Sequence, residues 1–75
     1  MKKYRIFFDE DYCLVCDEDG YFYVGKYFYA EDEGYKTAFD EAEIVDYLTD
    51  INPAVKPNHE FVQKFIEVFG VEVEE

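Results

Sequence analysis

The chain has 75 residues, of which 19 are acidic and 7 are basic, and its formal net charge is −12. Its apolar content of 49%, with eight Tyr and eight Phe, is too high for a disordered acidic tail, and its length allows one domain. Phosphate groups are bound by Lys and Arg, so these counts exclude a protein that binds nucleic acid or an anionic membrane on its own.

The first half of the chain predicts β-strands. Residues 4–8 and 12–16 are short runs rich in β-branched and aromatic side chains, residues 21–30 give the strongest strand pattern, and residues 35–38 can return as a fourth strand. Acidic turns separate these runs, and Gly20 in the second turn is free to take a left-handed conformation. We therefore expect an antiparallel meander of three or four strands.

The third predicted strand is rich in tyrosine. Its alternation places four tyrosines on one face and mostly apolar groups on the other. These tyrosines are Tyr21, Tyr23, Tyr27 and Tyr29. Gly25 interrupts the run, which predicts a β-bulge or, alternatively, a hairpin turn formed with Lys26.

The second half of the chain changes to helical periodicity. Asp40 is a good N-cap with Glu43 placed to complete a capping box, and a helix over residues 41–51 is expected to follow. The buried stripe expected on this helix consists of Ile44, Val45, Leu48 and Ile51.

A second helix is expected over residues 59–69, with Asn58 as its N-cap and Gly70 as its C-terminal stop. Residues 71–75 alternate, which predicts a short edge strand or, alternatively, a frayed tail. The whole chain, residues 1–75, is thus expected to be a single α+β domain with two C-terminal helices packed on one face of the meander.

The sequence shows neither a signal-peptide pattern nor a long apolar run, so the expected compartment is the cytosol.

Cys13 and Cys16 form a C-x-x-C pattern, which can be half of a zinc site or a redox pair. Zinc needs four ligands, and His59 is the only further nitrogen or sulfur candidate. The flanking acids favour the thiol over the reactive thiolate, and strand positions three apart point to opposite faces. We expect two structural cysteines, with a metal-binding module of Cys13, Cys16 and His59 as an alternative.

The acidic turns at residues 17–20 and 31–34 do not match a calcium-binding loop, because their acids are consecutive rather than alternating. The chain has no Ser-His-Asp or Cys-His pattern at a recognisable spacing and no glycine loop that could hold phosphate. We therefore expect no enzymatic activity, no metal and no cofactor.

Negative charge is concentrated in residues 9–55, which contain 14 acidic residues and two lysines, a net charge of −12 in this segment alone. In the predicted meander, the turns at residues 9–11 and 31–33 lie at one end of the sheet, and the turn at residues 17–19 lies at the other.

The candidate partner-binding residues are three acidic triplets, an acidic stripe on the first helix and two tyrosines. They are Asp9, Glu10, Asp11, Asp17, Glu18, Asp19, Glu31, Asp32, Glu33, Glu43, Asp46, Asp50, Tyr23 and Tyr27. Carboxylates on a rigid scaffold can contact the Lys and Arg that normally bind phosphates, and tyrosines can stack where bases would lie.

In size, in charge and in its acidic triplets, the chain resembles the small acidic inhibitors encoded by phages and other mobile elements. The most similar are the anti-CRISPR and anti-restriction DNA-mimic proteins. The resemblance includes no sequence motif, so no family residues are transferred to this chain. It implies a bacterial host cytosol, a stoichiometric protein partner and inhibition by blocking a nucleic-acid site.

These features favour a non-enzymatic inhibitor that occupies the cationic nucleic-acid-binding groove of a partner protein. The alternative is a small adaptor or regulatory subunit that binds a partner, or a second copy of the chain, through an aromatic face.

Overall fold

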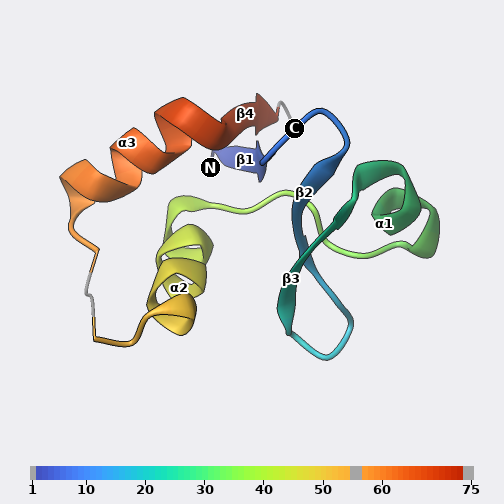
Figure 1. Ribbon diagram of the computed structural model, residues 1–75, viewed down its shortest axis with the longest axis horizontal. Helices are drawn as coiled ribbons and strands as arrows, with labels where there is room; N and C mark the ends of the chain where they lie inside the picture. Colours follow the sequence, from blue (N-terminus) through green and yellow to red (C-terminus); the bar gives the residue numbers. More distant parts are fainter. Residues whose placement is uncertain (1, 55–56, 74–75) are drawn as a thin grey trace.

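Seven helices and strands make up the part of the chain that the computed structural model describes, residues 2–54 and 57–73. They are β1 (Lys3–Ile6), β2 (Tyr12–Cys16), β3 (Phe22–Lys26), α1 (Tyr27–Glu33), α2 (Glu41–Ile51), α3 (His59–Phe69) and β4 (Gly70–Val73). The α+β class is confirmed (Figure 1). However, α1 was not expected, and the segment after the two expected helices forms β4, which is the edge strand that was one of the two predictions for residues 71–75.

The strands form two antiparallel pairs rather than a meander, so the expected sheet was wrong. β2 and β3 form a hairpin, whereas β1 pairs with β4, with Lys3 opposite Val73. The alternation of residues 71–75 therefore marks a strand, although residues 74 and 75 lie outside the described residues. β1 is paired by a segment almost seventy positions away, which no pattern of neighbouring residues indicates.

The expected fourth strand, residues 35–38, is an extended connection that joins the two pairs. Lys36 forms a bridge with Cys16 in β2, and Phe39 forms a bridge with Tyr4 in β1. Hydrogen bonds in both directions hold each bridge. The connection thus lies between β1 and β2 and keeps the two pairs next to each other.

The strand expected over residues 21–30 was wrong in its second half, where the chain forms α1. Tyr27 and Ala30, three residues apart, face inward on this helix: Ala30 is buried, and the Tyr27 ring centroid lies 5.5 Å from that of Phe7. Gly34 ends α1 in the left-handed conformation, with φ of 77°. The helix buries an apolar side while its acidic residues stay in solvent.

Gly25 forms neither a bulge nor a turn. It lies opposite Cys13 in a regular register, and the Tyr23 ring approaches it so closely that a Cβ at position 25 would lie 2.9 Å from Tyr23 Cε2. A side chain at position 25 would therefore require the partly exposed Tyr23 ring to shift.

Both predicted helix starts are confirmed. Asp40 Oδ1 accepts a hydrogen bond from the Glu43 N–H at 2.9 Å, and the Asp40 N–H donates to Glu43 Oε1 at 3.1 Å, which completes the capping box. Asn58 Oδ1 accepts from the Phe61 N–H at 2.8 Å. These caps explain why α2 and α3 have the bounds that the sequence predicts.

The apolar stripe of α2 is shorter than expected. Ile44 and Leu48 are buried and Val45 packs against the core, but Ile51 in the last turn is 62% exposed.

Two apolar clusters form the core. The larger contains Ile6, Leu14, Phe39, Ile44, Leu48, Val62 and Ile66, and the smaller contains Cys13, Val15 and Ala30. Cys13 belongs to the smaller cluster, whereas Cys16 packs against the larger one. The prediction that the two cysteines point to opposite faces of a strand is therefore confirmed.

Candidate partner-binding surface

In two of the acidic triplets, the first aspartate closes its own turn. Asp9 Oδ1 accepts hydrogen bonds from the backbone N–H groups of Asp11 and Tyr12, both at 2.9 Å. Asp17 Oδ1 accepts from those of Asp19 and Tyr21, both at 3.0 Å. These carboxylates hold loop geometry, and the two acids that follow each of them have exposed side chains.

The third triplet lies in α1 rather than in a turn, and its first member faces the protein. The Glu31 carboxylate lies 3.6 Å from the Arg5 guanidinium and accepts a hydrogen bond from Thr37 Oγ1 at 3.3 Å. Glu31, whose side chain is 46% exposed, is therefore held in a surface polar network with Arg5 and Thr37, and Asp32 and Glu33 are the other acids that α1 presents to solvent.

Tyr27 belongs to the same network and not to a tyrosine face. Arg5 lies over its ring at 5.3 Å from the centroid, and burial, together with a hydrogen bond to Glu31, raises the pKa of its hydroxyl. The predicted strand face of tyrosines was wrong at this position, because α1 turns the Tyr27 ring toward Arg5 and Phe7.

Part of the acidic stripe on α2 is already paired within the protein. Glu43 completes the capping box and pairs with Lys36, so its carboxylate is half-buried and already neutralised. Asp46 and Asp50 remain exposed on the outer side of α2.

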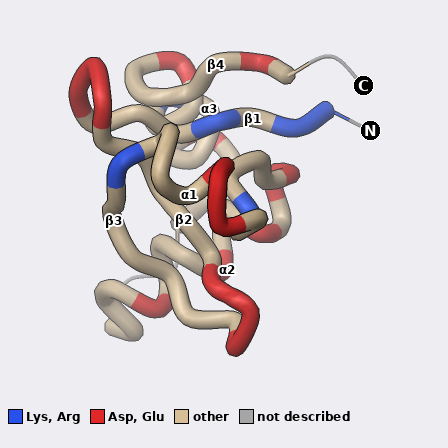
Figure 2. Tube along the Cα trace, turned by 90° about the vertical axis from the view of Figure 1, so that its right-hand side faces the viewer, with Lys and Arg blue, Asp and Glu red and all other residues tan. Residues whose placement is uncertain are grey.

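The fold brings acids from two triplets together. Asp17 and Glu18 of the β2–β3 turn and Glu33 at the end of α1 line one shallow hollow of about 230 Å³, together with Tyr35. Figure 2 shows the acidic stretches of α1 and of this turn on the same side of the molecule. The predicted placement of residues 31–33 with residues 9–11 was wrong, because α1 folds back toward the other turn.

Tyrosines complete this area, which we call the acidic–tyrosine surface. It consists of Asp17, Glu18, Glu33, Tyr23, Tyr29 and Tyr35. Tyr29 is 63% exposed and Tyr23 is 38% exposed. Lys36 also lines the hollow, but its ammonium group is paired with Glu43.

The pKa values of two tyrosine hydroxyls reflect the negative charges around them. Partial burial raises the pKa of Tyr23, and the Asp17 carboxylate raises it further. Partial burial likewise raises the pKa of Tyr35, with Glu33 and Glu18 adding to the effect. Both hydroxyls therefore stay protonated at neutral pH and can donate hydrogen bonds.

Sequence reasoning placed Tyr23 on this surface but missed Tyr35. A partial signal was present: Gly34 after a run of acids is typical of a helix C-cap, which indicates the end of a helix but not the position of Tyr35. The exposed acids Glu10, Asp11, Asp46 and Asp50 lie outside this surface.

The residues of the metal alternative do not converge. Burial raises the pKa of both Cys13 and Cys16, and His59 instead pairs with Glu41 at 2.9 Å. Within residues 2–54 and 57–73, no three side chains of His, Cys, Asp or Glu come together as metal ligands.

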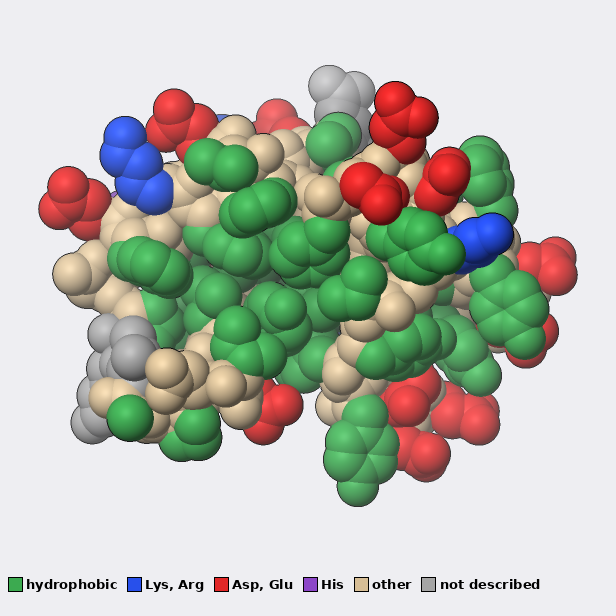
Figure 3. All heavy atoms as spheres, in the orientation of Figure 1, with side chains coloured by type: hydrophobic (Ala, Val, Ile, Leu, Met, Phe, Trp, Pro, Cys, Tyr) green, Lys and Arg blue, Asp and Glu red, His purple; other side chains and the backbone are tan. Residues whose placement is uncertain are grey.

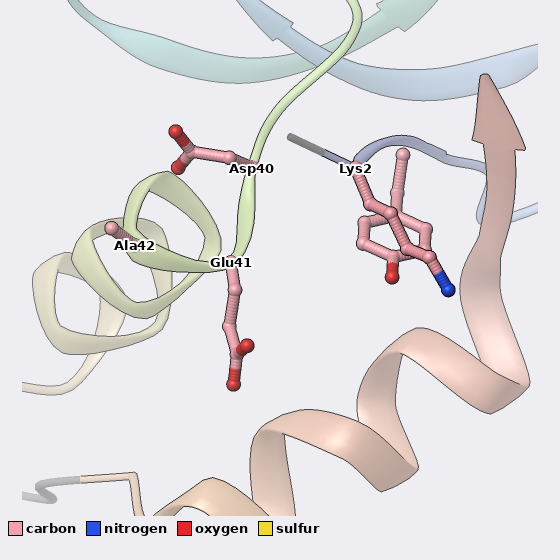
Figure 4. A pocket seen from close by; sticks show the side chains of 5 residues that line it. Lys2, Asp40, Glu41 and Ala42 are labelled. Carbon is pink, nitrogen blue, oxygen red and sulfur yellow. The ribbon is translucent and has the colours of Figure 1, made fainter. Parts of the chain in front are cut away.

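A second pocket, of about 280 Å³, lies between β1 and the start of α2 and includes Lys2, Asp40 and Glu41 (Figure 4). Asp40 caps α2, Glu41 extends toward α3, where it contacts His59 and Gln63, and Lys2 pairs with Glu72 at 3.5 Å. Each of these three charged groups is thus engaged in a contact within the fold.

Compared with known proteins, the chain matches no family model, no curated protein and no solved structure. No helix in the described part of the chain has the length and apolar character to cross a membrane.

Proposed function

We propose that the chain is a non-enzymatic acidic inhibitor that occupies the cationic nucleic-acid-binding surface of a partner protein, in the manner of a DNA mimic. The observation that carries this proposal is the convergence of Asp17, Glu18 and Glu33 with exposed tyrosines on one side of the molecule. Carboxylates there match the Lys and Arg that bind phosphates, and the phenol rings offer flat faces where bases would stack.

The charge of the whole chain supports the same partner. A net charge of −12 attracts a basic surface over a long range and makes association fast and sensitive to salt. For a phage-encoded chain, the site of action is the cytosol of the bacterial host.

The test compares two doubly substituted variants that each lose two negative charges. Glu18→Gln/Glu33→Gln changes the acidic–tyrosine surface, and Glu60→Gln/Glu67→Gln changes exposed acids of α3. Each variant is immobilised, incubated with bacterial lysate at low salt, and eluted with double-stranded DNA. We expect nucleic-acid-binding proteins among the DNA-eluted fraction, and about fivefold less of them on the first variant, since exposed ion pairs contribute about 0.2–1 kcal/mol each.

The control variant should capture as much as the unsubstituted chain. If DNA releases nothing, or if both variants lose capture equally, the acidic–tyrosine surface is not a nucleic-acid mimic.

A second candidate function, a small adaptor that binds through an aromatic face, is favoured by a different observation. Figure 3 shows a broad apolar area on the face seen in Figure 1. A chain of aromatic ring contacts packs against the larger cluster and consists of Phe8, Phe69, Phe65, Tyr47 and Phe22. Binding through this face would be insensitive to salt and unaffected by Glu18→Gln/Glu33→Gln.

A further inference from the structure

β3 is the outer strand of a two-stranded sheet, so one of its edges has no partner strand. Within residues 2–54 and 57–73, β3 pairs with β2 alone. An open edge of this kind is a template on which another extended chain can pair.

The register identifies which backbone groups face outward. The Tyr27 N–H donates to the Asp11 carbonyl at 2.8 Å, and the Asp17 N–H donates to the Tyr21 carbonyl at 3.0 Å, so hydrogen-bonded pairs lie at both ends of the hairpin. In an antiparallel pair, every second residue turns its N–H and C=O away from the partner strand. The outward-facing residues of β3 are therefore Phe22, Val24 and Lys26.

Within residues 2–54 and 57–73, no strand other than β2 and no isolated bridge pairs with Phe22, Val24 or Lys26. The Lys26 carbonyl is the exception among the outward-facing groups, because Lys26 is the N-cap of α1 and its carbonyl lies where the first helical hydrogen bond forms. Val24 is 49% exposed and Lys26 is exposed, so solvent reaches this edge. Phe22 is half-buried, because its ring packs against Phe39 and Tyr47 at centroid distances of 5.8 and 5.6 Å.

Acidic groups surround the open edge. One end of β3 meets the turn of residues 9–11, through the bond between Tyr27 and Asp11, and the other end meets the turn of residues 17–19. One face of β3 carries Phe22 and Val24, with Lys26 at its end, and the opposite face carries Tyr23 beside the carboxylates of the acidic–tyrosine surface. A chain paired with β3 would thus have apolar surroundings on one face and negative surroundings on the other.

We propose that the outer edge of β3 binds an extended segment of a cationic partner protein by strand addition, and that apolar residues alternate with Lys or Arg in this segment. The apolar side chains contact Val24 and Phe22, and the basic ones face the acidic–tyrosine surface, because successive side chains of a strand point to opposite faces. The inference rests on the proposed function only in requiring a cationic partner.

A second copy of the chain is a poor occupant of the same edge. Antiparallel pairing of two β3 strands would bring the acidic turn of residues 9–11 of one copy against that of residues 17–19 of the other. Like charges at both ends, on two chains that each carry −12, oppose this dimer.

The probe is a synthetic peptide of about seven residues with alternating Val and Lys and with blocked ends, titrated at low salt by calorimetry. Two further versions carry N-methyl groups, one on each Val and the other on each Lys. Only one edge of an added strand faces β3, so one methylated version should bind at least tenfold more weakly than the parent and the other should bind like it.

The matched protein variants are Lys26→Pro and Lys26→Gln. Lys26 has φ of −68°, a value that proline adopts, and its N–H faces outward, so proline removes one donor of the open edge. Both variants lose the same positive charge, which by itself would strengthen binding of a basic peptide. We expect Lys26→Pro to bind at least tenfold more weakly than Lys26→Gln, with equal circular dichroism spectra.

The inference is overturned by equal binding of Lys26→Pro and Lys26→Gln, by equal binding of all three peptides, or by absence of saturable binding. If Lys26→Pro does not fold, binding of the methylated peptides to the unsubstituted chain tests the proposal instead. A dimer that Lys26→Gln retains and Lys26→Pro loses would make a second copy the occupant and contradict the proposal. If these peptide tests fail, the DNA-elution experiment can still support the proposed function. If DNA elution fails, peptide binding that follows the N-methyl pattern still supports strand addition at β3.

Discussion

At the level of single residues, acidic side chains within one triplet have different roles. Asp17 accepts two backbone hydrogen bonds and fixes the turn, while Glu18, next to it, projects into the solvent and lines the acidic–tyrosine surface. Glu31 and Glu33 divide in the same way on α1, since Glu31 pairs with Arg5 and Glu33 lies at the surface. Substitutions at Asp17 or Glu31 will therefore change the fold as well as any binding, and Glu18 and Glu33 are the better probes of function.

Gly70 gives a sharp prediction at this scale. Its φ of −87° is open to any residue, but a Cβ there would lie 2.6 Å from the Ile66 carbonyl oxygen. We expect Gly70→Ala to lower the free energy of unfolding by about 1–3 kcal/mol, because the junction between α3 and β4 must shift. Urea denaturation measures the change.

Glu67→Ala, an exposed substitution in the last turns of α3, is the control for Gly70→Ala and should change stability by less than about 0.5 kcal/mol. Equal unfolding midpoints for Gly70→Ala and the unsubstituted chain would show that the junction has room for a side chain.

At the level of elements, local signals explain what could be predicted. Capping side chains next to an amphipathic run define α2 and α3, and a compact apolar run defines β2, so their bounds follow from neighbouring residues alone. α1 was missed because Tyr, Phe and Ala alternate well enough for a strand, and only packing on Phe7 and the cap at Gly34 favour the helix. The pairing of β1 with β4 depends on distant residues and leaves no local pattern.

The candidate surface was likewise predictable only as far as local sequence patterns determine it. The acidic triplets are visible in the sequence, but which of their members meet depends on where α1 folds back. That placement is tertiary, which is why Glu33 and Tyr35 join Asp17 in the structure and Tyr27 does not.

The capping box of α2 gives a prediction for an element. Asp40→Ala removes the acceptor for the Glu43 N–H, and Glu43 loses its reciprocal arrangement. We expect a loss of about 1 kcal/mol in the free energy of unfolding. Thermal unfolding followed by circular dichroism measures it.

Asp46→Ala, in an exposed position of the same helix, is the matched control for Asp40→Ala and also removes one negative charge. If the two variants unfold at the same temperature, loss of the capping box changes the stability no more than removal of one negative charge does.

At the scale of the whole molecule, alkaline pH should destabilise the fold. Burial raises the pKa of Cys13, Cys16, Tyr23, Tyr27, Tyr35 and Tyr47 above the ordinary values of 9.0 for Cys and 10.0 for Tyr. Each group is an acid that the folded state keeps protonated more firmly than the unfolded state does. Its contribution is complete below the unfolded-state pKa and is lost as the pH rises through the folded-state pKa.

We therefore expect the urea midpoint to fall from about pH 9 upward, at high salt as well as at low salt, because screening removes only the general repulsion. Tyr47→Phe, which removes one of these ionisations, should show a shallower fall. A midpoint that is constant between neutral pH and about pH 10.5 would contradict the role of burial in these shifts.

The pairing of β1 with β4 also bears on the order in which the molecule folds. The β2–β3 hairpin and the helices close short loops, whereas joining Lys3 to Val73 closes a loop that contains every other element. The entropy of closing a loop rises with its length, so this pairing becomes favourable only after the intervening chain has condensed. We therefore expect the sheet that joins the two ends of the described chain to be completed last, after the hairpin with the open β3 edge has formed.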